Sequence, residues 1–208
     1  CTRSSYQEVG GRLMTRSVVQ LGGQALKLDA DGDTTIQVSS DDVLIISTGG
    51  TERLKIDANG HITNPTQCAF LVENSDNQTN ITNATIELAT ERFDLNGDFN
   101  NSTDTFTAPV TGKYQISSSI MLANLPNDSN YAYAQLNFSN LNTEIYFDPA
   151  TMDEASEGGH NISHSILMDM DANDTLQLKF YQHGGTAAAD ILGTSSQLTT
   201  YLSGHLVA

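Results

Sequence analysis

The chain has 208 residues, with 9 Lys and Arg against 25 Asp and Glu, which gives a formal net charge of −16. This excess of acid argues against nucleic acid as a partner, because a phosphate-binding surface needs clustered Lys and Arg. Apolar residues recur in short patterned runs, which indicates a folded chain rather than a disordered one. No run approaches the roughly 20 apolar residues of a membrane-spanning helix, so we expect no membrane insertion.

The chain begins at Cys1 rather than Met, as expected at a processed terminus or, more simply, at a fragment boundary. An N-terminal cysteine can also mark a lipid-anchored bacterial protein. Cys1 and Cys68 are the only cysteines in the sequence. They are too few for a disulfide-stapled scaffold, and they leave the redox compartment open.

The acidity belongs to the C-terminal part of the chain. Residues 1–64 carry six basic and eight acidic residues, a net charge of −2. Residues 65–208 carry three basic and 17 acidic residues, a net charge of −14. We therefore expect the exterior of the C-terminal part to carry the acid, and any bound cation to lie there.

The N-terminal part, residues 1–64, shows a succession of very short apolar segments separated by Gly, Asn and Asp. The predicted strands cover residues 25–28, 35–38, 43–47, 53–56 and 60–62. Each strand buries about two side chains, too few for an independent sheet. We expect this part to be stable only by association, either with the C-terminal part or with copies of itself around an axis.

From Pro65 onward the predicted strands lengthen and are rich in Ile, Leu, Phe, Tyr and Thr. They cover residues 68–72, 84–88, 105–107, 113–122, 131–138, 144–147, 164–170, 175–181 and 199–207. Clean alternation in residues 131–138 and 175–180 is typical of half-buried antiparallel strands. Residues 149–157 fit either a turn of helix or a surface loop. The pattern predicts an all-β fold, a two-sheet sandwich or jelly roll.

One segment carries a family resemblance. Phe106-Thr-Ala-Pro109-Val-Thr-Gly112-Lys-Tyr114 resembles the signature of the globular head of the complement q subcomponent, a jelly roll related to the tumour necrosis factor family. Further similar segments follow in the family's order: Ala69-Phe70, Phe93-Asp94, residues 96–100, residues 166–169 with 173–176, and residues 201–206. Asn173 stands where the family usually has Gly, and Leu202 where it has Phe. The resemblance implies a homotrimeric jelly-roll head over residues 65–208, in which Gly112 allows the chain to reverse and calcium is often bound.

A second resemblance covers the N-terminal part. The run Thr51-Glu52-Arg53-Leu54-Lys55-Ile56-Asp57-Ala-Asn59-Gly60 is similar to a repeat in phage tail-fibre proteins, which also occurs in bacterial surface proteins. Together the two resemblances imply a trimeric β stalk, residues 1–64, carrying a trimeric head. The predicted function is a non-enzymatic virion appendage or tail-fibre tip that binds a host cell-surface glycan or protein through head loops. The alternative is a bacterial cell-surface or extracellular structural protein that assembles through its heads.

The aromatic side chains are assigned mainly to the interior. We expect these residues in the core or at a trimer axis rather than in ligand contacts: Phe70, Phe106, Tyr114, Phe138, Phe180 and Tyr201. His183-Gly184-Gly185 is typical of a loop tip, where receptor contacts would lie.

The sequence shows no motif of a hydrolase, a phosphate-binding loop or a zinc protease, so no catalytic residue and no required cofactor are predicted. Two acidic groups are weak calcium candidates, Asp29, Asp31 and Asp33 in one turn and Asp169, Asp171 and Asp174 in another. Gly32 comes too early for a helix-loop-helix calcium site, and solvated turns explain both groups more simply. His160 and His164 share one face and are expected to be surface or interface histidines rather than zinc ligands.

Overall fold

The computed structural model describes residues 8–9, 12–13, 24–151 and 159–208. Cys1 and much of the 149–157 stretch therefore lie outside the described residues. The chain divides into two compact units, Cys1–Pro65 and Thr66–Ala208, one residue from the predicted boundary. In the described part, no helix has both the length and the apolar character needed to cross a membrane.

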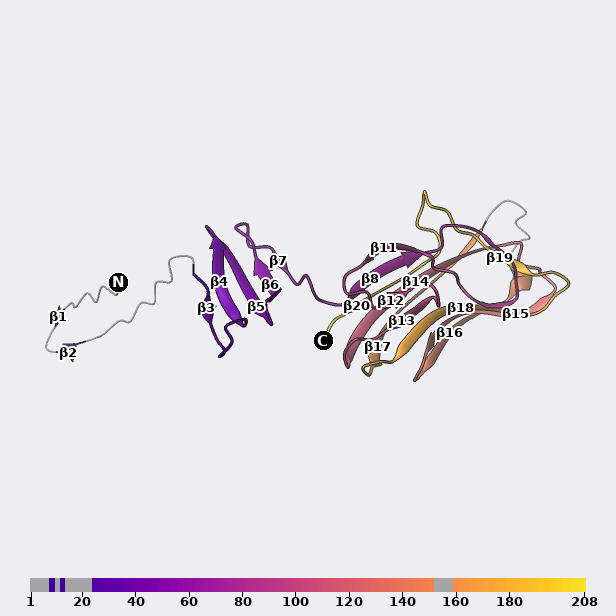
Figure 1. The fold of residues 1–208 in the computed structure, drawn as a ribbon. Helices are drawn as coiled ribbons and strands as arrows, with labels where there is room; N and C mark the ends of the chain where they lie inside the picture. The colour runs from indigo at the N-terminus through magenta and orange to yellow at the C-terminus, as the bar shows by residue number, and fades with distance from the viewer. Residues whose placement is uncertain (1–7, 10–11, 14–23, 152–158) are drawn as a thin grey trace. The chain divides into compact units, whose positions relative to one another are not determined.

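The first unit, which we call the stalk unit, contains a five-stranded antiparallel sheet in sequential order (Figure 1). Its strands are β3 (Leu26–Lys27), β4 (Thr35–Ser40), β5 (Val43–Thr48), β6 (Thr51–Ile56) and β7 (Ile62–Thr63). A separate pair joins β1 (Glu8–Val9) to β2 (Arg12–Leu13). Each of the five short strands predicted for this unit overlaps one strand of the sheet.

The tail-fibre-like run forms one strand and one tight turn. Residues Thr51–Ile56 are strand β6, and the Asp57 carboxylate accepts hydrogen bonds from the backbone N–H groups of Asn59 and His61, each 2.9 Å long. Gly60 has φ of 85°, a conformation that favours glycine. The Asp and the Gly of this run are thus explained by the turn that reverses the chain.

The stalk sheet has one apolar face. The cross-strand register places these side chains on it: Leu26, Ile36, Val38, Leu44, Ile46, Leu54, Ile56 and Ile62. None of residues 24–65 is buried, and Ile62 is 64% exposed. The sheet is a single layer without a core of its own.

The second unit, the head, is a sandwich of two antiparallel sheets (Figure 1). The six-stranded sheet contains β10 (Asn83–Thr85), β12 (Phe99–Asn100), β13 (Thr105–Thr107), β15 (Ser129–Phe138), β16 (Asn142–Phe147) and β18 (Thr175–Gly184). The seven-stranded sheet contains β8 (Ala69–Glu73), β9 (Gln78–Ile81), β11 (Thr90–Asp94), β14 (Gly112–Ala123), β17 (His160–Met170), β19 (Ala189–Ile191) and β20 (Tyr201–Leu206). A 3-10 turn, η1 (Pro149–Thr151), lies in the stretch where the sequence allowed a turn of helix. The predicted all-β jelly-roll sandwich is confirmed.

Aromatic rings fill the space between the two sheets. Phe70 stacks on Phe106 with ring centroids 4.5 Å apart, and Tyr114 meets the edge of Phe106 at 5.7 Å. The Tyr114 hydroxyl donates to the Val110 carbonyl at 2.7 Å, which satisfies its polar end. Five of the six aromatic residues expected inside are buried. Tyr201 is the exception: it is half-buried, because the strand alternation that buries Leu202 turns it to the opposite face.

Gly112 is needed for a reason other than the predicted chain reversal. Its φ is not in the left-handed region, and it is the first residue of β14. A Cβ there would lie 2.6 Å from Leu206 Cδ1 and 2.7 Å from the Ala208 carbonyl oxygen. Close approach of the C-terminal strand therefore excludes any larger residue.

Candidate functional site

The outward face of the six-stranded sheet carries a cluster of aromatic side chains that the strand register brings together. On β15, Tyr133 lies opposite Tyr181 of β18 and Tyr146 of β16. Tyr131, two residues earlier on the same face, lies opposite His183. We call these five residues the tyrosine face.

The rings of the tyrosine face form a continuous row. Tyr133 stacks on Tyr181 with centroids 4.7 Å apart and lies 4.8 Å from Tyr146, while Tyr131 lies 4.9 Å from His183. Such cross-strand aromatic pairs stabilise a sheet. Tyr146 is nevertheless 59% exposed, so the row also presents a broad aromatic surface to solvent.

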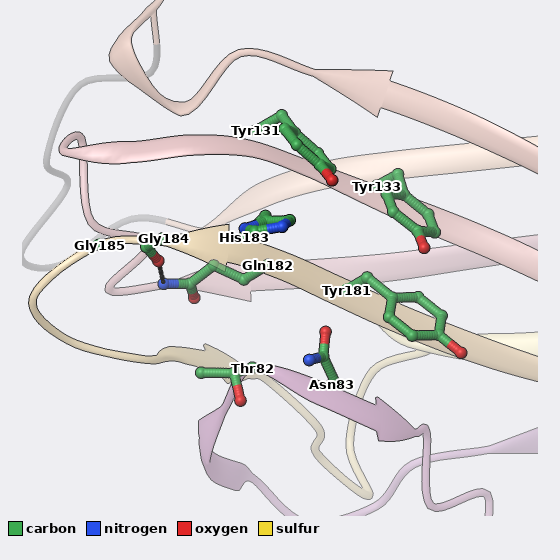
Figure 2. A pocket seen from close by; sticks show the side chains of 9 residues that line it. All are labelled: Thr82, Asn83, Tyr131, Tyr133, Tyr181, Gln182, His183, Gly184 and Gly185. Carbon is green, nitrogen blue, oxygen red and sulfur yellow. Dashed lines mark hydrogen bonds between the residues drawn. The ribbon is translucent and has the colours of Figure 1, made fainter.

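A depression of about 490 Å³ adjoins this row (Figure 2). Its lining residues are Thr82, Asn83, Tyr131, Tyr133, Tyr181, Gln182, His183, Gly184 and Gly185. The set combines aromatic rings with an amide, a hydroxyl and glycine backbone, and it contains no Asp, Glu, Lys or Arg. Its volume lies within the range of small-molecule sites, and its lining is more polar than in most of them.

The rim of the depression is held by a buried amide. Gln182 is 4% exposed, and its Nε2 donates to the Ala187 carbonyl at 2.8 Å and to Ser129 Oγ at 3.1 Å. Its Oε1 accepts the Ala189 N–H at 3.0 Å. Gly185, with φ of 93°, has no room for a Cβ beside Ser129. The segment that forms the rim is therefore fixed before any ligand arrives.

Two phenol groups of the row, those of Tyr133 and Tyr146, stay neutral near pH 7. Burial, followed by the nearby Glu144 carboxylate, raises the pKa of Tyr133 above its usual value. The pKa of Tyr146 is also raised, and the largest cause is a hydrogen bond to the same Glu144 carboxylate. Each hydroxyl can therefore donate as well as accept a hydrogen bond.

The sequence pointed to this region through His183-Gly184-Gly185, but it did not identify the tyrosine face. The alternation of Tyr131 and Tyr133 with alanines was a visible signal. The partnership with Tyr146 and Tyr181 depends on pairing between distant strands, which a single sequence does not reveal.

The first acidic group forms a compact turn in the stalk unit. Carboxylate oxygens of Asp29, Asp31 and Asp33 all lie within 4.8 Å of one another and are exposed. Asp29 accepts the N–H groups of Gly32 and Thr34, each at 3.0 Å, and hydrogen bonding from Thr34 is the main cause that lowers its pKa to about 2. The turn is thus built from its own hydrogen bonds. Calcium binding there stays a prediction, to be tested by melting with and without a chelator.

The second acidic group is not brought together as a metal site in the described residues, where Asp29, Asp31 and Asp33 are the one such cluster. Asp174 accepts from Ser139 Oγ at 2.7 Å and from the Asp171 N–H at 2.8 Å. Asp169 pairs with Lys113 at 3.1 Å. These contacts give the carboxylates roles in fixing the β17–β18 turn.

His160 and His164 both lie on β17 and are half-buried. Burial lowers the pKa of His164, and its Nδ1 is buried without a hydrogen-bond partner. Among the described residues they gather with no Asp, Glu or Cys in a metal-binding arrangement.

The fold defines a jelly-roll head. Residues 69–207 match the C1q domain family, and the chain therefore belongs to it. Domains of this family commonly form homotrimers, are generally non-enzymatic binding modules and are usually extracellular or secreted.

The comparison with solved structures gives matches at low identity. The globular domain of zebrafish complement 1qA protein is 15% identical with a TM-score of 0.50, over 68% of this chain and 98% of that one. Murine APRIL is 8% identical with a TM-score of 0.47, over 68% of this chain and 99% of that one. No curated protein sequence matches the chain.

Proposed function

We propose that this chain is a non-enzymatic attachment protein: a homotrimeric C1q-type head, carried on the stalk unit, that binds a host cell surface as the tip of a virion appendage. The tyrosine face carries the proposal. Its exposed rings border a depression whose rim is already fixed, and together they offer a preformed contact surface.

The stalk sheet supports assembly from copies of the chain. Eight apolar side chains share one face, and none of them is buried. A single-layer sheet with such a face gains little stability alone and needs a cover. Because C1q domains commonly form homotrimers, three heads would hold three stalk units at high effective concentration, which favours packing of these faces against one another.

The virion assignment rests on the tail-fibre-like run Thr51–Gly60, which folds as a strand and a turn in the stalk unit. A bacterial surface protein that assembles through its heads without a specific ligand is the second candidate, because similar runs also occur in such proteins.

Binding of the purified chain to a panel of isolated bacterial envelopes tests the proposal. We expect saturable binding to some envelopes, competed by free protein and lost in the double variant Tyr131→Ala/Tyr146→Ala. Leu141→Ala is the matched control, since Leu141 is 60% exposed and lies in the β15–β16 turn, outside the tyrosine face. A stable trimer that binds no envelope would favour the structural alternative. Equal binding by the double variant would exclude this face.

A further inference from the structure

We infer that the tyrosine face and its depression bind uncharged saccharide rings. This inference rests on the proposed attachment function and names the ligand class for the same site. It follows from the aromatic rings that line the depression, the available polar groups and the charge of the head.

Tyr181 lines the depression. β18 lies between β15 and β10, so Tyr181 has the stacked ring of Tyr133 on one side and Asn83 on the other. Figure 2 shows the Asn83 side chain beside the Tyr181 ring, with the Thr82 side chain next to it. A pyranose has a flat C–H surface and a hydroxyl rim, which fit an aromatic wall beside an amide and a hydroxyl.

The polar groups of the depression are available to a ligand. Within the described residues, the side chains of Thr82 and Asn83 make no hydrogen bond to another residue, and neither do the hydroxyls of Tyr131 and Tyr181. An amide offers two donors and an acceptor, and each hydroxyl can donate or accept. Neighbouring ring hydroxyls of a sugar, which also donate and accept, can therefore be satisfied without a charged partner.

The negative charge of the head disfavours anionic ligands. The depression is lined by no Lys or Arg, and the head carries a net charge of −14. Phosphate, sulfate and carboxylate groups need cationic partners, so nucleic acids and anionic glycans are disfavoured although bases also stack on aromatic rings. On the outward face the next row contains Lys179 on β18, Gln135 opposite it on β15, and Glu144 opposite Gln135 on β16. An uncharged saccharide can stack on the aromatic rings and is not repelled by the negative charge of the head.

The rim favours a ligand that fits a rigid site. Both the nitrogen and the oxygen of the Gln182 amide are hydrogen-bonded to the segment 184–189. Gln182 therefore serves as a positioning residue rather than a ligand contact. Gln182→Leu should therefore loosen the rim and weaken binding, with raised proteolysis of this segment as a separate readout.

Direct titration tests the inference. The chain lacks Trp, so its fluorescence near 305 nm comes from tyrosine. The 208-residue chain is titrated with uncharged oligosaccharides of glucose, mannose and galactose, and with oligogalacturonate and a heparin fragment as anionic probes. We expect a saturable change with at least one uncharged oligosaccharide that persists at 0.5 M salt. Tyr181→Ala should lower that affinity about tenfold or more, with Leu141→Ala unchanged. Saturation by anionic probes alone, or no saturable response to any uncharged probe, would overturn the inference.

Binding to chemically treated envelopes distinguishes a failure of the saccharide inference from a failure of the proposed attachment function. Periodate oxidation should abolish binding, while protease treatment and 0.5 M salt should leave it intact. If binding through the tyrosine face resists periodate but is lost after protease treatment, the saccharide inference is overturned while the proposed attachment function stands. Absence of binding to every untreated envelope would count against attachment itself.

Discussion

Arg92 and Glu73 form an ion pair in which Nη2 of the guanidinium lies 2.6 Å from Oε1 of a carboxylate that is 1% exposed. The register between β11 and β8 shifts between Glu91 and Phe93, which brings Arg92 out of the ladder and over Glu73. Arg92 also donates to the Ser195 carbonyl at 3.1 Å, so the pair ties β8 to the segment before β20.

Removal of one partner should leave a buried charge. Arg92→Met is expected to lower the free energy of unfolding by about 3 kcal/mol or more, measured by urea denaturation. Glu73→Gln/Arg92→Met should recover part of that loss. The control Lys113→Met breaks an exposed pair, Lys113 with Asp169, and should cost less than about 1 kcal/mol. A loss in Arg92→Met no larger than in Lys113→Met would contradict the dependence of the buried Glu73 carboxylate on Arg92.

Asn173 has φ of 74°, the left-handed conformation, at the position where the family usually has Gly. Asn tolerates this conformation better than other non-glycine residues but less well than Gly. Asn173→Gly should therefore be neutral or raise the melting temperature, and Asn173→Ala should lower the free energy of unfolding by about 1 kcal/mol. An alanine variant as stable as the glycine variant would show that the turn relaxes.

His164 should make the head less stable in mild acid. Burial lowers its pKa from the ordinary 6.5, so the folded state favours the neutral ring. As the pH falls below about 6.5 the unfolded state binds a proton first, and the free energy of unfolding decreases until the folded ring also titrates. His164→Asn should therefore lose less stability than the native chain between pH 7.5 and pH 5.5. Equal losses of stability in the two proteins would show that His164 does not cause the pH dependence.

Neighbouring residues on β5 offer a matched test of the stalk sheet. Ile46 lies on the apolar face, opposite Ile36 and Leu54, whereas Ile45 lies on the other face, opposite Gln37 and Lys55. Ile46→Asn should weaken self-association about tenfold or more in sedimentation equilibrium, since it places an amide in a packed face. Ile45→Asn should have little effect. Equal effects of the two substitutions would mean that this face is not an interface.

Local pattern was sufficient for much of the fold. Alternation in residues 131–138 and 175–181 predicted β15 and β18, and Gly and Asn turns separated the short stalk strands. Strands β11 and β12 of the head were not predicted, since Thr90–Asp94 is mostly polar and Phe99–Asn100 is only two residues long. Strands β9 and β19 were missed as well, because Gln78–Ile81 is mostly polar and Ala189–Ile191 is only three residues long. Both pair at the end of the seven-stranded sheet, where tertiary contacts decide the conformation.

The binding surface was less accessible to sequence reasoning than the core. Phe70 and Phe106 belong to a motif and are buried as expected. Tyr146 and Tyr181 belong to no motif, and they acquire meaning only when β16 and β18 pair on either side of β15. Register between distant strands was the missing information.

Light scattering on the purified 208-residue chain tests the proposed homotrimer most directly. The predicted mass is three times 22.4 kDa, and it should stay the same when the protein is diluted within the micromolar range. A stable particle of 22.4 kDa would contradict the trimer and leave the apolar face of the stalk sheet without the cover proposed for it.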